Sequence, residues 1–459
     1  MFQIDLEKPI HVHFMGIGGI SMSGLAEILL SKKFPVSGSD AKKTDLTTHL
    51  EDLGAKIAYR QCAENISDQI DLVVYTSAIH PDNPEFAKAA EMGIPMLTRA
   101  ELLGQLMSHY HTSLAISGTH GKTTTTSMLS DILLTADTDP TLSIGGILKT
   151  IHSNFRIGAE KYFVTEACEY TNSFLSLYPD VAVILNVDAD HLDFFKDLDD
   201  IYHSFRKFAE NVPAGGNLIL AHDIPKRDYL TENLPCKVTT FGFDASADYY
   251  AEDITFDALA HPSFTCVCPD GTKLPIVLHV PGQHNVGNAL AAIAAAKILG
   301  ISDQAITAAL EAFTGSARRF EYKGKIGGVT IVDDYAHHPT EIAATLTAAK
   351  KSNPAKLWCV FQPHTYSRTK ALLKDFAKAL SLADHVVLTD IYAARETDTL
   401  GISSKNLQEE IQALGKPCDY FSTFDEVENF LLENCTQDEL LITMGAGDVH
   451  KIGESLLGQ

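Results

Sequence analysis

Short apolar runs rich in β-branched residues alternate with helical patterns along almost the whole chain. The predicted strands span residues 10–15, 71–76, 114–117, 163–166, 181–187, 329–333, 357–361, 385–389 and 440–444. The predicted helices span residues 21–31, 123–135, 284–299, 339–350 and 368–382. Strands and helices in alternation form parallel sheets with helices on their faces. The sequence therefore predicts an α/β protein, and the strand-prone stretch 238–280 fits this alternation less regularly.

Chain length and two polar breaks predict three domains. With 459 residues, the chain is too long for a single hydrophobic core. One helical stretch ends in a polar cluster at Ser108, and another is broken by the sequence Phe-Thr-Gly-Ser that ends at Ser316. We therefore expect domains at residues 1–108, 109–316 and 317–459.

Composition excludes several classes of protein. Hydrophobic residues make up 45% of the chain, which is enough for each domain to form a core. The net charge of −23 and the lack of a basic patch argue against nucleic-acid and anionic-membrane partners. The N-terminus lacks a signal-peptide pattern, no apolar run is long enough to span a bilayer, and the eight cysteines are scattered. We expect a soluble cytoplasmic protein with reduced thiols.

A glycine-rich loop between a predicted strand and a predicted helix indicates a nucleotide site. It reads Gly118-Thr119-His120-Gly121-Lys122-Thr123, and it is shorter than the usual phosphate loop because Ile116 occupies the outer glycine position. Backbone amides of such a loop bind phosphate oxygens. Lys122 can reach the β- and γ-phosphates, and the Thr123 hydroxyl can ligate Mg²⁺.

A second glycine-rich loop lies near the N-terminus. It reads Gly16-Ile17-Gly18-Gly19-Ile20-Ser21, and Asp40 follows a second short strand. Such a loop brings backbone amides to a diphosphate at a helix N-terminus, and an acidic residue at this distance can bind a ribose hydroxyl. The dinucleotide fingerprint requires Gly or Ala where this chain has Ser21. The loop is therefore either a diphosphate site or an ordinary glycine turn.

Acidic residues and a histidine follow the next predicted strands. They are Glu166, Glu169, Asp188, Asp190 and His191. Since Mg²⁺ prefers oxygen ligands, Glu166 is a candidate ligand. His191 either ligates a metal or orients a carboxylate, and the aspartates are either part of a site or solvated loop charges.

Polar clusters at strand ends in the last third of the chain predict one shared site. They are Arg318-Arg319-Phe320, then Asp333 to Pro339, and then Gln362 to Arg368. Arginine binds carboxylate and phosphoryl groups through its planar fork. Before them, Asn285 begins an alanine-rich helix, where it either caps the helix or contacts an adenine edge.

Six motifs in this order resemble those of the Mur ligases. They are Gly-Ile-Gly-Gly at residues 16–19, Gly-Thr-His-Gly-Lys-Thr at 118–123, Gly-x-His-Asn at 282–285, Arg-Arg-Phe at 318–320, Asp-Asp-Tyr-Ala-His-His-Pro-Thr-Glu at 333–341 and Phe-Gln-Pro-His-Thr-Tyr-Ser-Arg-Thr at 361–369. The resemblance implies a Rossmann-like N-terminal domain for a UDP-sugar, a central P-loop ATPase-like domain and a Rossmann-like C-terminal domain for an amino acid.

The resemblance also implies a reaction, an ATP-dependent amide ligation in peptidoglycan synthesis. The lactyl carboxylate of UDP-N-acetylmuramate would be phosphorylated by ATP, and the amine of L-alanine would attack the acyl phosphate, releasing ADP and phosphate. ATP and Mg²⁺ would be the cofactors, and we expect a monomer or a weak homodimer.

By the same resemblance, each motif receives a role. ATP would be held by Gly118, Thr119, His120, Gly121, Lys122, Thr123, Thr124, Asn285, Asn288, Arg319 and Asp334. The UDP-sugar would be held by Gly16, Gly18, Gly19, Ser21, Asp40 and Ser77. The metal would be bound by Thr123, Glu166 and His191, and alanine by Tyr335, His337 and Arg368. The catalytic residues would be Lys122, His191, His337 and Arg368.

One departure and three alternatives remain. Some Mur ligases have Arg where this chain has Thr365, so Arg368 would provide more of the contact to the alanine carboxylate. A related ligase that adds a recycled tripeptide to UDP-N-acetylmuramate differs in its first loop. An NAD-dependent oxidoreductase would leave the Lys122 loop unexplained, and a regulatory protein without turnover would not need Lys122, Glu166, His191 and Arg368.

Overall fold

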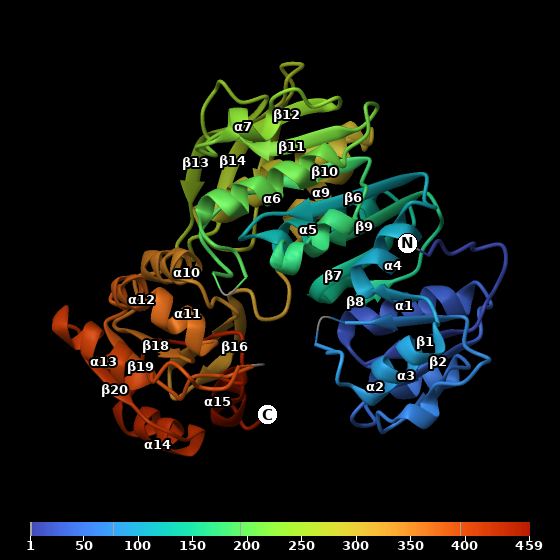
Figure 1. Ribbon diagram of the computed structural model, residues 1–459. Coiled ribbons are helices and arrows are strands. Elements are labelled where there is room, and N and C mark those ends of the chain that lie inside the picture. Colours follow the sequence, from blue (N-terminus) through green and yellow to red (C-terminus); the bar gives the residue numbers. More distant parts are fainter. Residues whose placement is uncertain (1, 77, 193, 395) are drawn as a thin grey trace.

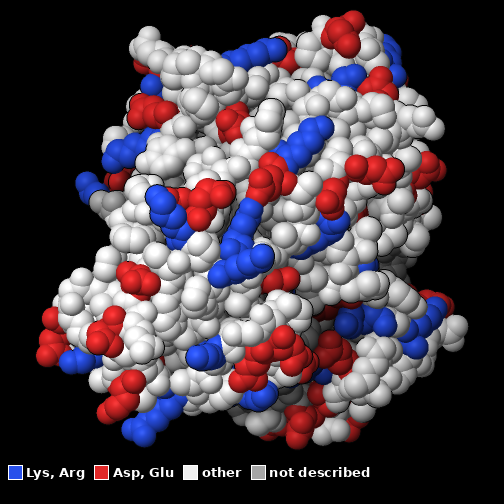
Figure 2. All heavy atoms as spheres, turned by 90° about the vertical axis from the view of Figure 1, so that its right-hand side faces the viewer, with Lys and Arg blue, Asp and Glu red and all other residues white. Residues whose placement is uncertain are grey.

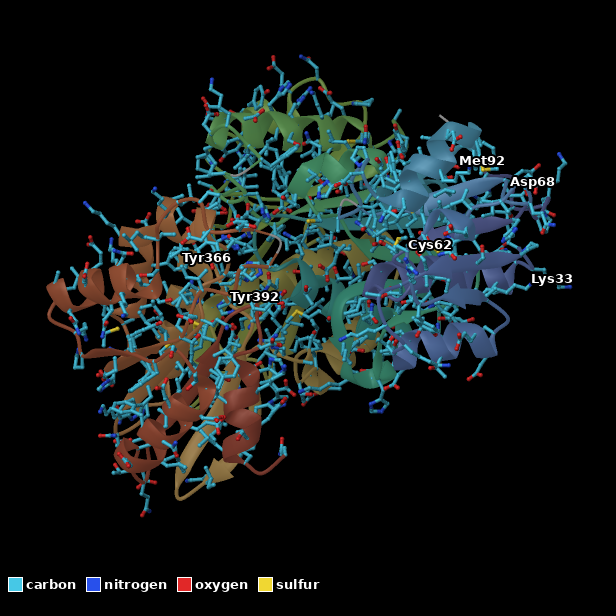
Figure 3. The ribbon with its side chains drawn as sticks, turned by 60° about the horizontal axis from the view of Figure 1, so that its bottom comes forward. Lys33, Cys62, Asp68, Met92, Tyr366 and Tyr392 are labelled. Atoms are coloured by element: carbon cyan, nitrogen blue, oxygen red, sulfur yellow. The ribbon has the colours of Figure 1, made fainter. Side chains whose placement is uncertain are left out.

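The computed structural model describes residues 2–76, 78–192, 194–394 and 396–459, and the predicted site residue Ser77 lies outside them. The chain forms three α/β domains, each built on its own sheet. In Figures 1 and 3 the blue N-terminal domain and the orange-to-red C-terminal domain lie on different sides of the green central domain. The α/β prediction is confirmed, and the domain boundaries at residues 108 and 316 stay a prediction.

The N-terminal domain is a five-stranded parallel sheet in the order β3-β2-β1-β4-β5. Its middle strand, β1, is buried along its whole length. The strand order reverses at β1, and in sheets of this kind ligands bind at the loop that follows such a strand. The elements are β1 (Val12–Met15), α1 (Ile20–Ser31), β2 (Val36–Ser39), α2 (Asp45–Asp52), β3 (Lys56–Ala58), η1 (Ala63–Asn65), β4 (Leu72–Tyr75), α3 (Pro84–Met92), β5 (Met96–Thr98) and α4 (Arg99–Met107).

The central domain is a ten-stranded mixed sheet in the order β15-β14-β13-β12-β11-β10-β6-β9-β7-β8. Strand β6 pairs in parallel with β10 on one side and β9 on the other. The stretch 238–280 departs from the alternation of strands and helices because β13, β14 and β15 form consecutive antiparallel pairs. The strands are β6 (Thr112–Ser117), β7 (Thr141–Leu148), β8 (Ser153–Arg156), β9 (Tyr162–Glu166), β10 (Val181–Ile184), β11 (Asn217–Ala221), β12 (Lys237–Gly242), β13 (Tyr249–Phe256), β14 (Pro262–Val267) and β15 (Lys273–Val277). The helices are α5 (Lys122–Thr135), η2 (Lys149–Ile151), η3 (Tyr170–Ser176), α6 (Leu198–Glu210), α7 (Arg227–Thr231), α8 (Gln283–Ile298) and α9 (Asp303–Ala312).

The C-terminal domain is a six-stranded sheet in the order β16-β17-β21-β18-β19-β20, in which only β16 runs antiparallel to its neighbour. The single helix predicted for residues 368–382 is wrong, because Leu372 leaves helical geometry (φ −112°, ψ 21°) and separates two helices. The elements are β16 (Glu321–Ile326), β17 (Val329–Asp334), α10 (Pro339–Lys351), β18 (Leu357–Phe361), α11 (Tyr366–Ala371), α12 (Leu373–Leu380), β19 (His385–Leu388), α13 (Ser404–Ala413), β20 (Cys418–Tyr420), α14 (Phe424–Asn434), β21 (Leu440–Met444) and α15 (His450–Leu456).

Close helix contacts attach the N-terminal domain to the central one. Phe155 of β8 packs directly on Gly24 of α1, and the Ser176 carbonyl oxygen lies where a Cβ at Gly104 of α4 would be.

Acidic and basic side chains lie intermixed on the face shown in Figure 2. Within the described part of the chain, no helix is long and apolar enough to cross a membrane.

Candidate nucleotide and substrate site

The loop between β6 and α5 has the backbone geometry of a phosphate-binding loop. Gly118 and Gly121 adopt φ values of +137° and +85°, which favour glycine. A Cβ at Gly121 would lie 2.5 Å from Asn288 Oδ1, so the loop packs tightly against α8. Among the described residues, no side chain caps α5, which leaves the amides of its first turn for an anion.

Lys122 folds back over this loop. Its Nζ donates to the carbonyl oxygens of Gly118 (2.5 Å) and Thr119 (3.1 Å) and lies 3.0 Å from Glu169 Oε2. Burial alone lowers the pKa of Lys122, but the charge and hydrogen bond of Glu169, together with the neighbouring Cys168 and Glu166, outweigh burial and raise the pKa above its ordinary value. Lys122 is therefore a fixed cation next to the amides of the loop.

Thr123 and Glu166 reach the same short stretch of β7. The Gly145 N–H donates to Glu166 Oε1 (2.6 Å), and a Cβ at the adjacent Gly146 would lie 3.1 Å from the Thr123 methyl group. A hydroxyl and a carboxylate so close to the phosphate loop are oxygen donors of the kind that Mg²⁺ prefers. These residues therefore fit a magnesium ion.

His191 joins this cluster through a different carboxylate. Its Nε2 lies 3.7 Å from Glu169 Oε1 and 3.7 Å from Asp190 Oδ2. Burial lowers the pKa of His191, which favours the neutral ring that a metal requires. In this structure His191 contacts Glu169, whereas Glu166 contacts Gly145. The predicted metal ligands His191 and Glu166 therefore have different partners.

A cavity of about 420 Å³ lies between the central and C-terminal domains. Apolar side chains such as Leu185, Phe241 and Phe243 form part of its wall. Seven of the predicted nucleotide residues line it, although they lie far apart in the sequence. These residues are His120, Gly121, Thr124, Asn285, Asn288, Arg319 and Asp334.

The asparagines of α8 have side-chain partners on their own segment. Asn285 Nδ2 donates to the Pro281 carbonyl oxygen (2.9 Å), and Asn288 Nδ2 donates to Asn285 Oδ1 (2.9 Å). The alternative that Asn285 caps the helix is wrong, because the N-cap position is Gly282 and no described side chain caps α8. Both asparagines instead form part of the cavity wall.

Arg319 and Asp334 form the C-terminal side of the cavity. Asp334 accepts hydrogen bonds from the Phe320 and Ala336 amides (both 2.7 Å), and its burial raises the pKa to about 6. The Arg319 guanidinium lies over the Tyr335 ring, 5.2 Å from its centroid, and donates to Thr123 Oγ1 across 3.4 Å. Arg319 thus reaches from the C-terminal domain to the phosphate loop.

Arg368 and Asp190 pair between the two domains. The Arg368 Nε atom lies 3.0 Å from Asp190 Oδ1, and Nη2 lies 3.4 Å from Oδ2. Burial opposes ionisation of Asp190, but Arg368 and the neighbouring histidines together hold the Asp190 pKa well below its usual value. Arg368 and Asp190 line a small pocket of about 60 Å³ together with His191.

Tyr335 and His337 lie near each other, with ring centroids 5.4 Å apart. His337 Nδ1 lies 3.0 Å from the Tyr335 carbonyl oxygen, and burial lowers the pKa of His337 to about 4. The ring is therefore neutral at physiological pH. Thr365 is buried with φ +67°, donates its amide to the Tyr392 carbonyl oxygen, and is absent from the walls of both described cavities.

The first glycine loop is formed as a separate site in the N-terminal domain. Gly16 has φ +78°, and the Asp40 carboxylate accepts from the Gly18 amide (2.8 Å) and the Ala41 amide (2.7 Å). Asp40 therefore braces the loop. Gly19 precedes α1 without a side-chain cap from the described residues, and Ser21 is exposed in the first turn.

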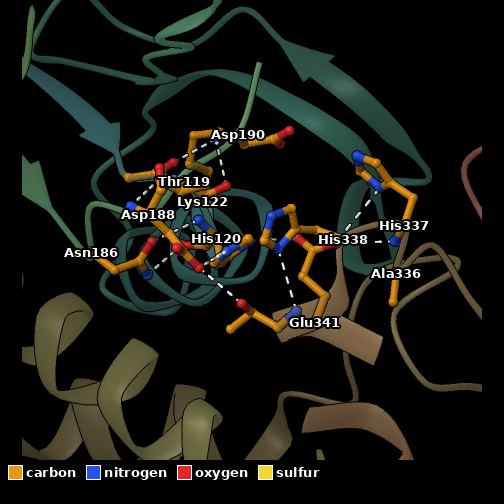
Figure 4. A network of polar contacts seen from close by, with 12 residues as sticks. Thr119, His120, Lys122, Asn186, Asp188, Asp190, Ala336, His337, His338 and Glu341 are labelled. Atoms are coloured by element: carbon orange, nitrogen blue, oxygen red, sulfur yellow. Dashed lines mark hydrogen bonds and ion pairs between the residues drawn. The ribbon is translucent and has the colours of Figure 1, made fainter. Parts of the chain in front are cut away.

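Sequence reasoning missed the role of several acidic residues. Asp188 and Asp190 were left open as either site residues or solvated loop charges. Asp188 pairs with His120 (Figure 4), and Asp190 pairs with Arg368. Glu341 was not selected, yet its carboxylate contacts His120 Nδ1 at 3.1 Å. Its position in the first turn of a predicted helix, beside two histidines, was a local signal, but the partner lies 221 residues away.

Comparison with known proteins agrees with this architecture. Residues 11–111 match the family model described as Mur ligase family, catalytic domain, residues 116–296 match the Mur ligase middle domain, and residues 318–447 match the Mur ligase, glutamate ligase domain. The chain is 58% identical to the UDP-N-acetylmuramate–L-alanine ligase of Agathobacter rectalis and 57% identical to that of Lachnospira eligens, covering 100% of each protein in both cases.

Solved structures give the same result. The UDP-N-acetylmuramate-alanine ligase of Thermotoga maritima is 30% identical with a TM-score of 0.80, and 98% of each chain is covered. The murein peptide ligase of Psychrobacter arcticus is 27% identical with a TM-score of 0.72, again with 98% of each chain covered. With three family models matched in order and full-length relatives above 50% identity, the chain belongs to the Mur ligase family.

Proposed function

We propose that this protein ligates L-alanine to the lactyl carboxylate of UDP-N-acetylmuramate at the expense of ATP, in peptidoglycan synthesis. One observation supports this most directly, a continuous row of ionisable side chains between the phosphate loop and the small pocket. The row runs from Lys122 to Glu169 (3.0 Å), His191 (3.7 Å), Asp190 (3.7 Å) and Arg368 (3.0 Å). A phosphoryl donor at one end and a small acceptor at the other would meet along it.

In this proposal the phosphate loop and its cations stabilise the transferring phosphoryl group. Amides of the first turn of α5, Lys122 and Arg319 would bind phosphate oxygens, because preorganised donors are most effective in a dry site. Thr123 and Glu166, with His191 next to them, would hold Mg²⁺. When bound, the ion would neutralise charge on the phosphates.

The acceptor would lie in the small pocket between Arg368 and the Asp190–His191 segment. Arg368 Nε and Nη2 contact Asp190, and Nη1 lies 3.1 Å from His364 Nδ1. The guanidinium has five N–H donors, so Arg368 would bind the alanine carboxylate with those that remain, and Tyr335 and His337 would complete this end. A pocket of about 60 Å³ suits a methyl side chain better than a peptide. The neutral amine would then attack the carbonyl carbon of the acyl phosphate, and the tetrahedral intermediate would expel phosphate as the nitrogen loses a proton. The two ligands therefore have to be held at attacking distance.

The sugar nucleotide would occupy the N-terminal domain, with its diphosphate at Gly16, Gly18, Gly19 and Ser21. This loop precedes an uncapped helix within the described chain, which is a favourable place for a diphosphate. The relatives named UDP-N-acetylmuramate–L-alanine ligase support alanine as the acceptor, since they cover the whole chain at 58% and 57% identity. The murein peptide ligase of Psychrobacter arcticus is less similar, at 27% identity.

Phosphate release from ATP tests the proposal. The purified protein is assayed with UDP-N-acetylmuramate and, in parallel, with L-alanine, glycine, L-serine and one tripeptide. Release should require the sugar nucleotide and be fastest with L-alanine. Release only with the tripeptide would identify the recycling ligase instead, and binding of NAD in a nicotinamide fluorescence titration would favour an oxidoreductase. Sedimentation of the same sample tests the expected monomer or weak homodimer.

A further inference from the structure

A group of polar side chains joins the central and C-terminal domains at the rim of the nucleotide cavity (Figure 4). His120 of the phosphate loop lies between two carboxylates, with Nδ1 3.1 Å from Glu341 Oε1 and Nε2 3.2 Å from Asp188 Oδ2. Glu341 belongs to α10 in the C-terminal domain, and Asp188 follows β10 in the central domain. Since ionised carboxylates only accept hydrogen bonds, both ring nitrogens donate, and His120 is an imidazolium.

The charges of this group stabilise one another. Burial lowers the pKa of His120, but its hydrogen bonds to Asp188 and Glu341 outweigh burial and raise the pKa to about 9. The bond from His120 holds the pKa of Asp188 well below its usual value. Burial opposes ionisation of Glu341, yet the neighbouring histidines keep its pKa low as well. All three groups therefore stay charged at physiological pH.

Other titratable and charged groups also face this cluster. The His338 ring lies 4.7 Å from the His120 ring, and burial lowers its pKa, so it is neutral. His337 Nδ1 lies 3.6 Å from the other carboxylate oxygen, Glu341 Oε2, and the charge of Arg319 also favours ionised Glu341. His120 is thus the cation that contacts carboxylates of both domains.

The first turn of α10 adds two more bonds across the same boundary. His338 Nε2 donates to the Ala189 carbonyl oxygen (3.1 Å), and Thr340 Oγ1 donates to Asp188 Oδ2 (2.8 Å). His338 also caps α10, with Nδ1 accepting from the Thr340 amide. The helix start is therefore attached to the segment that leads to Asp190 and His191.

The His120 ring is not needed to shape the loop itself. Asn186 holds the His120 backbone on both sides, because its Oδ1 accepts from the His120 amide (2.8 Å) and its Nδ2 donates to the His120 carbonyl oxygen (3.0 Å). The Asp188 amide in turn donates to Thr119 Oγ1 (2.9 Å). The loop geometry therefore has its own supports, and the ring is available for contact with the C-terminal domain.

We propose that His120 is a positioning residue, a latch that ties Glu341 to Asp188 and so sets the C-terminal domain against the phosphate loop. The inference rests on the proposed function, because ligation requires that the alanine end, formed by Tyr335, His337 and Arg368, be aligned with the phosphoryl group. Misalignment by a fraction of the size of one atom is enough to slow such a reaction strongly.

Steady-state kinetics of His120→Gln, Glu341→Gln and the double variant test the latch. Each single variant should lower kcat about tenfold or more, and in Glu341→Gln the dissociation constant of ATP should stay within about threefold by calorimetry. Because both substitutions break the same contact, the double variant should be no slower than the slower single variant. Glu454→Gln is the control, since Glu454 pairs with Lys323 inside the C-terminal domain (3.2 Å).

The pH profile separates the latch from a merely structural role. In the wild type, kcat should fall as pH rises through about 9, where His120 loses its proton. Glu341→Gln should move this limb to lower pH, because one of the two carboxylates that stabilise the proton is removed, and His120→Gln should abolish the limb. A substitution that only loosened the fold would lower kcat equally at all pH values.

Hydrogen exchange provides a readout that does not need turnover. Peptides covering residues 335–345 should exchange faster in His120→Gln and in Thr340→Val than in the wild type, and Thr340→Val serves if Glu341→Gln does not fold. Normal kcat in Glu341→Gln, additive losses in the double variant or unchanged exchange would each overturn the latch. A wild type that releases no phosphate with L-alanine, but shows the exchange difference, would overturn the proposed function and leave the latch supported.

Discussion

At the scale of single residues, the two principal cations of the site have partners within the protein. Lys122 contacts two loop carbonyls and Glu169, and Arg368 contacts Asp190. Such partners fix the direction of a long side chain before a ligand arrives, which lowers the entropy lost on binding. They also mean that removing either cation leaves a buried carboxylate unpaired, so function and stability have to be measured together.

We predict that Lys122→Met separates the two glycine loops by function. Methionine keeps the apolar bulk but removes the charge next to the phosphate loop, so turnover should fall about a hundredfold or more. Binding of UDP-N-acetylmuramate to the nucleotide-free enzyme should stay within about threefold, because the effect of one distant charge is screened at physiological salt. Calorimetry with the sugar nucleotide measures this. Loss of sugar-nucleotide binding in a folded variant would mean that the two sites are reversed.

Arg368→Ala should act on the acceptor instead. Removal of a charge-assisted contact to the alanine carboxylate should cost about 2–4 kcal/mol in kcat/KM for L-alanine, with little change in ATP affinity. Arg368→Lys keeps the charge near Asp190 but loses the planar fork, so it should recover stability more than activity. Initial rates and thermal midpoints of both variants give the comparison. Unchanged alanine kinetics in Arg368→Ala would exclude this role.

At the scale of secondary-structure elements, the sequence predicted buried strands well because their apolar runs are continuous. The predicted strands 357–361 and 440–444 coincide with β18 and β21, which are buried throughout. The break at Leu372 was missed because the helical pattern of residues 368–382 continues across it, and only tertiary packing separates the two helices.

The candidate site could be predicted in part, because the buried strands locate the residues that follow them. Asp334 ends β17, and Lys122 begins the helix after the loop that follows β6, so both lie at the carboxyl ends of strands, and a sequence motif marks each of them. The pairing of His120 with Glu341 depends on how two domains meet, and no local pattern encodes that arrangement. The pairing of Asp190 with Arg368 could not be predicted for the same reason, since the two residues lie 178 positions apart in the sequence.

Helix α5 contains a carboxyl group that should make stability depend on pH. Asp131 is buried, and its Oδ1 has no hydrogen-bond partner among the described residues. Burial raises its pKa from 3.8 to about 6, although a hydrogen bond with Thr150 acts in the opposite direction. Between these pH values the folded protein binds more protons than the unfolded chain. The stability from this group is therefore full below pH 3.8 and is lost as pH rises through about 6.

Asp131→Asn should remove this dependence. At pH 7.5 the buried charge costs about 2–3 kcal/mol, so the variant should unfold at a higher temperature than the wild type, with the difference shrinking at pH 5. Thermal unfolding of both proteins across this range measures it. Asp137→Asn, at an exposed position just after the helix, is the matched control. A difference between Asp131→Asn and wild type that stays constant with pH would contradict the prediction.

At the scale of the whole molecule, the site depends on the placement of three separate sheets. The sugar nucleotide, ATP and the amino acid are assigned to different domains, so each interface between domains has to fix the distance between two ligands. The interface of the C-terminal domain consists largely of polar contacts, such as those of His120 and Arg368. The interface of the N-terminal domain is a close packing of α4 on η3, and this difference allows the two to be tested separately.

Gly104 of α4 is the tightest point of the N-terminal interface. A Cβ there would overlap the Ser176 carbonyl oxygen at the end of η3. Segment η3 is held from its other side, because Asn211 donates to the Leu175 and Leu177 carbonyl oxygens (3.0 and 2.9 Å) and the Phe174 ring stacks on Phe208. The strain of a larger residue should therefore move α4, and with it the N-terminal domain, away from Glu169.

We predict that Gly104→Ala raises the KM for UDP-N-acetylmuramate about tenfold or more, because overpacking displaces the loop at Gly16 from the phosphoryl donor. ATP affinity should stay within about threefold, since α5 and α8 do not contribute to this contact. Gly215→Ala is the control, as its Cβ would meet nothing within 4 Å. Initial-rate kinetics and calorimetry with ATP alone measure both quantities. A normal KM for the sugar nucleotide in a stable Gly104→Ala enzyme would show that the α4–η3 contact does not set the spacing between the two substrates.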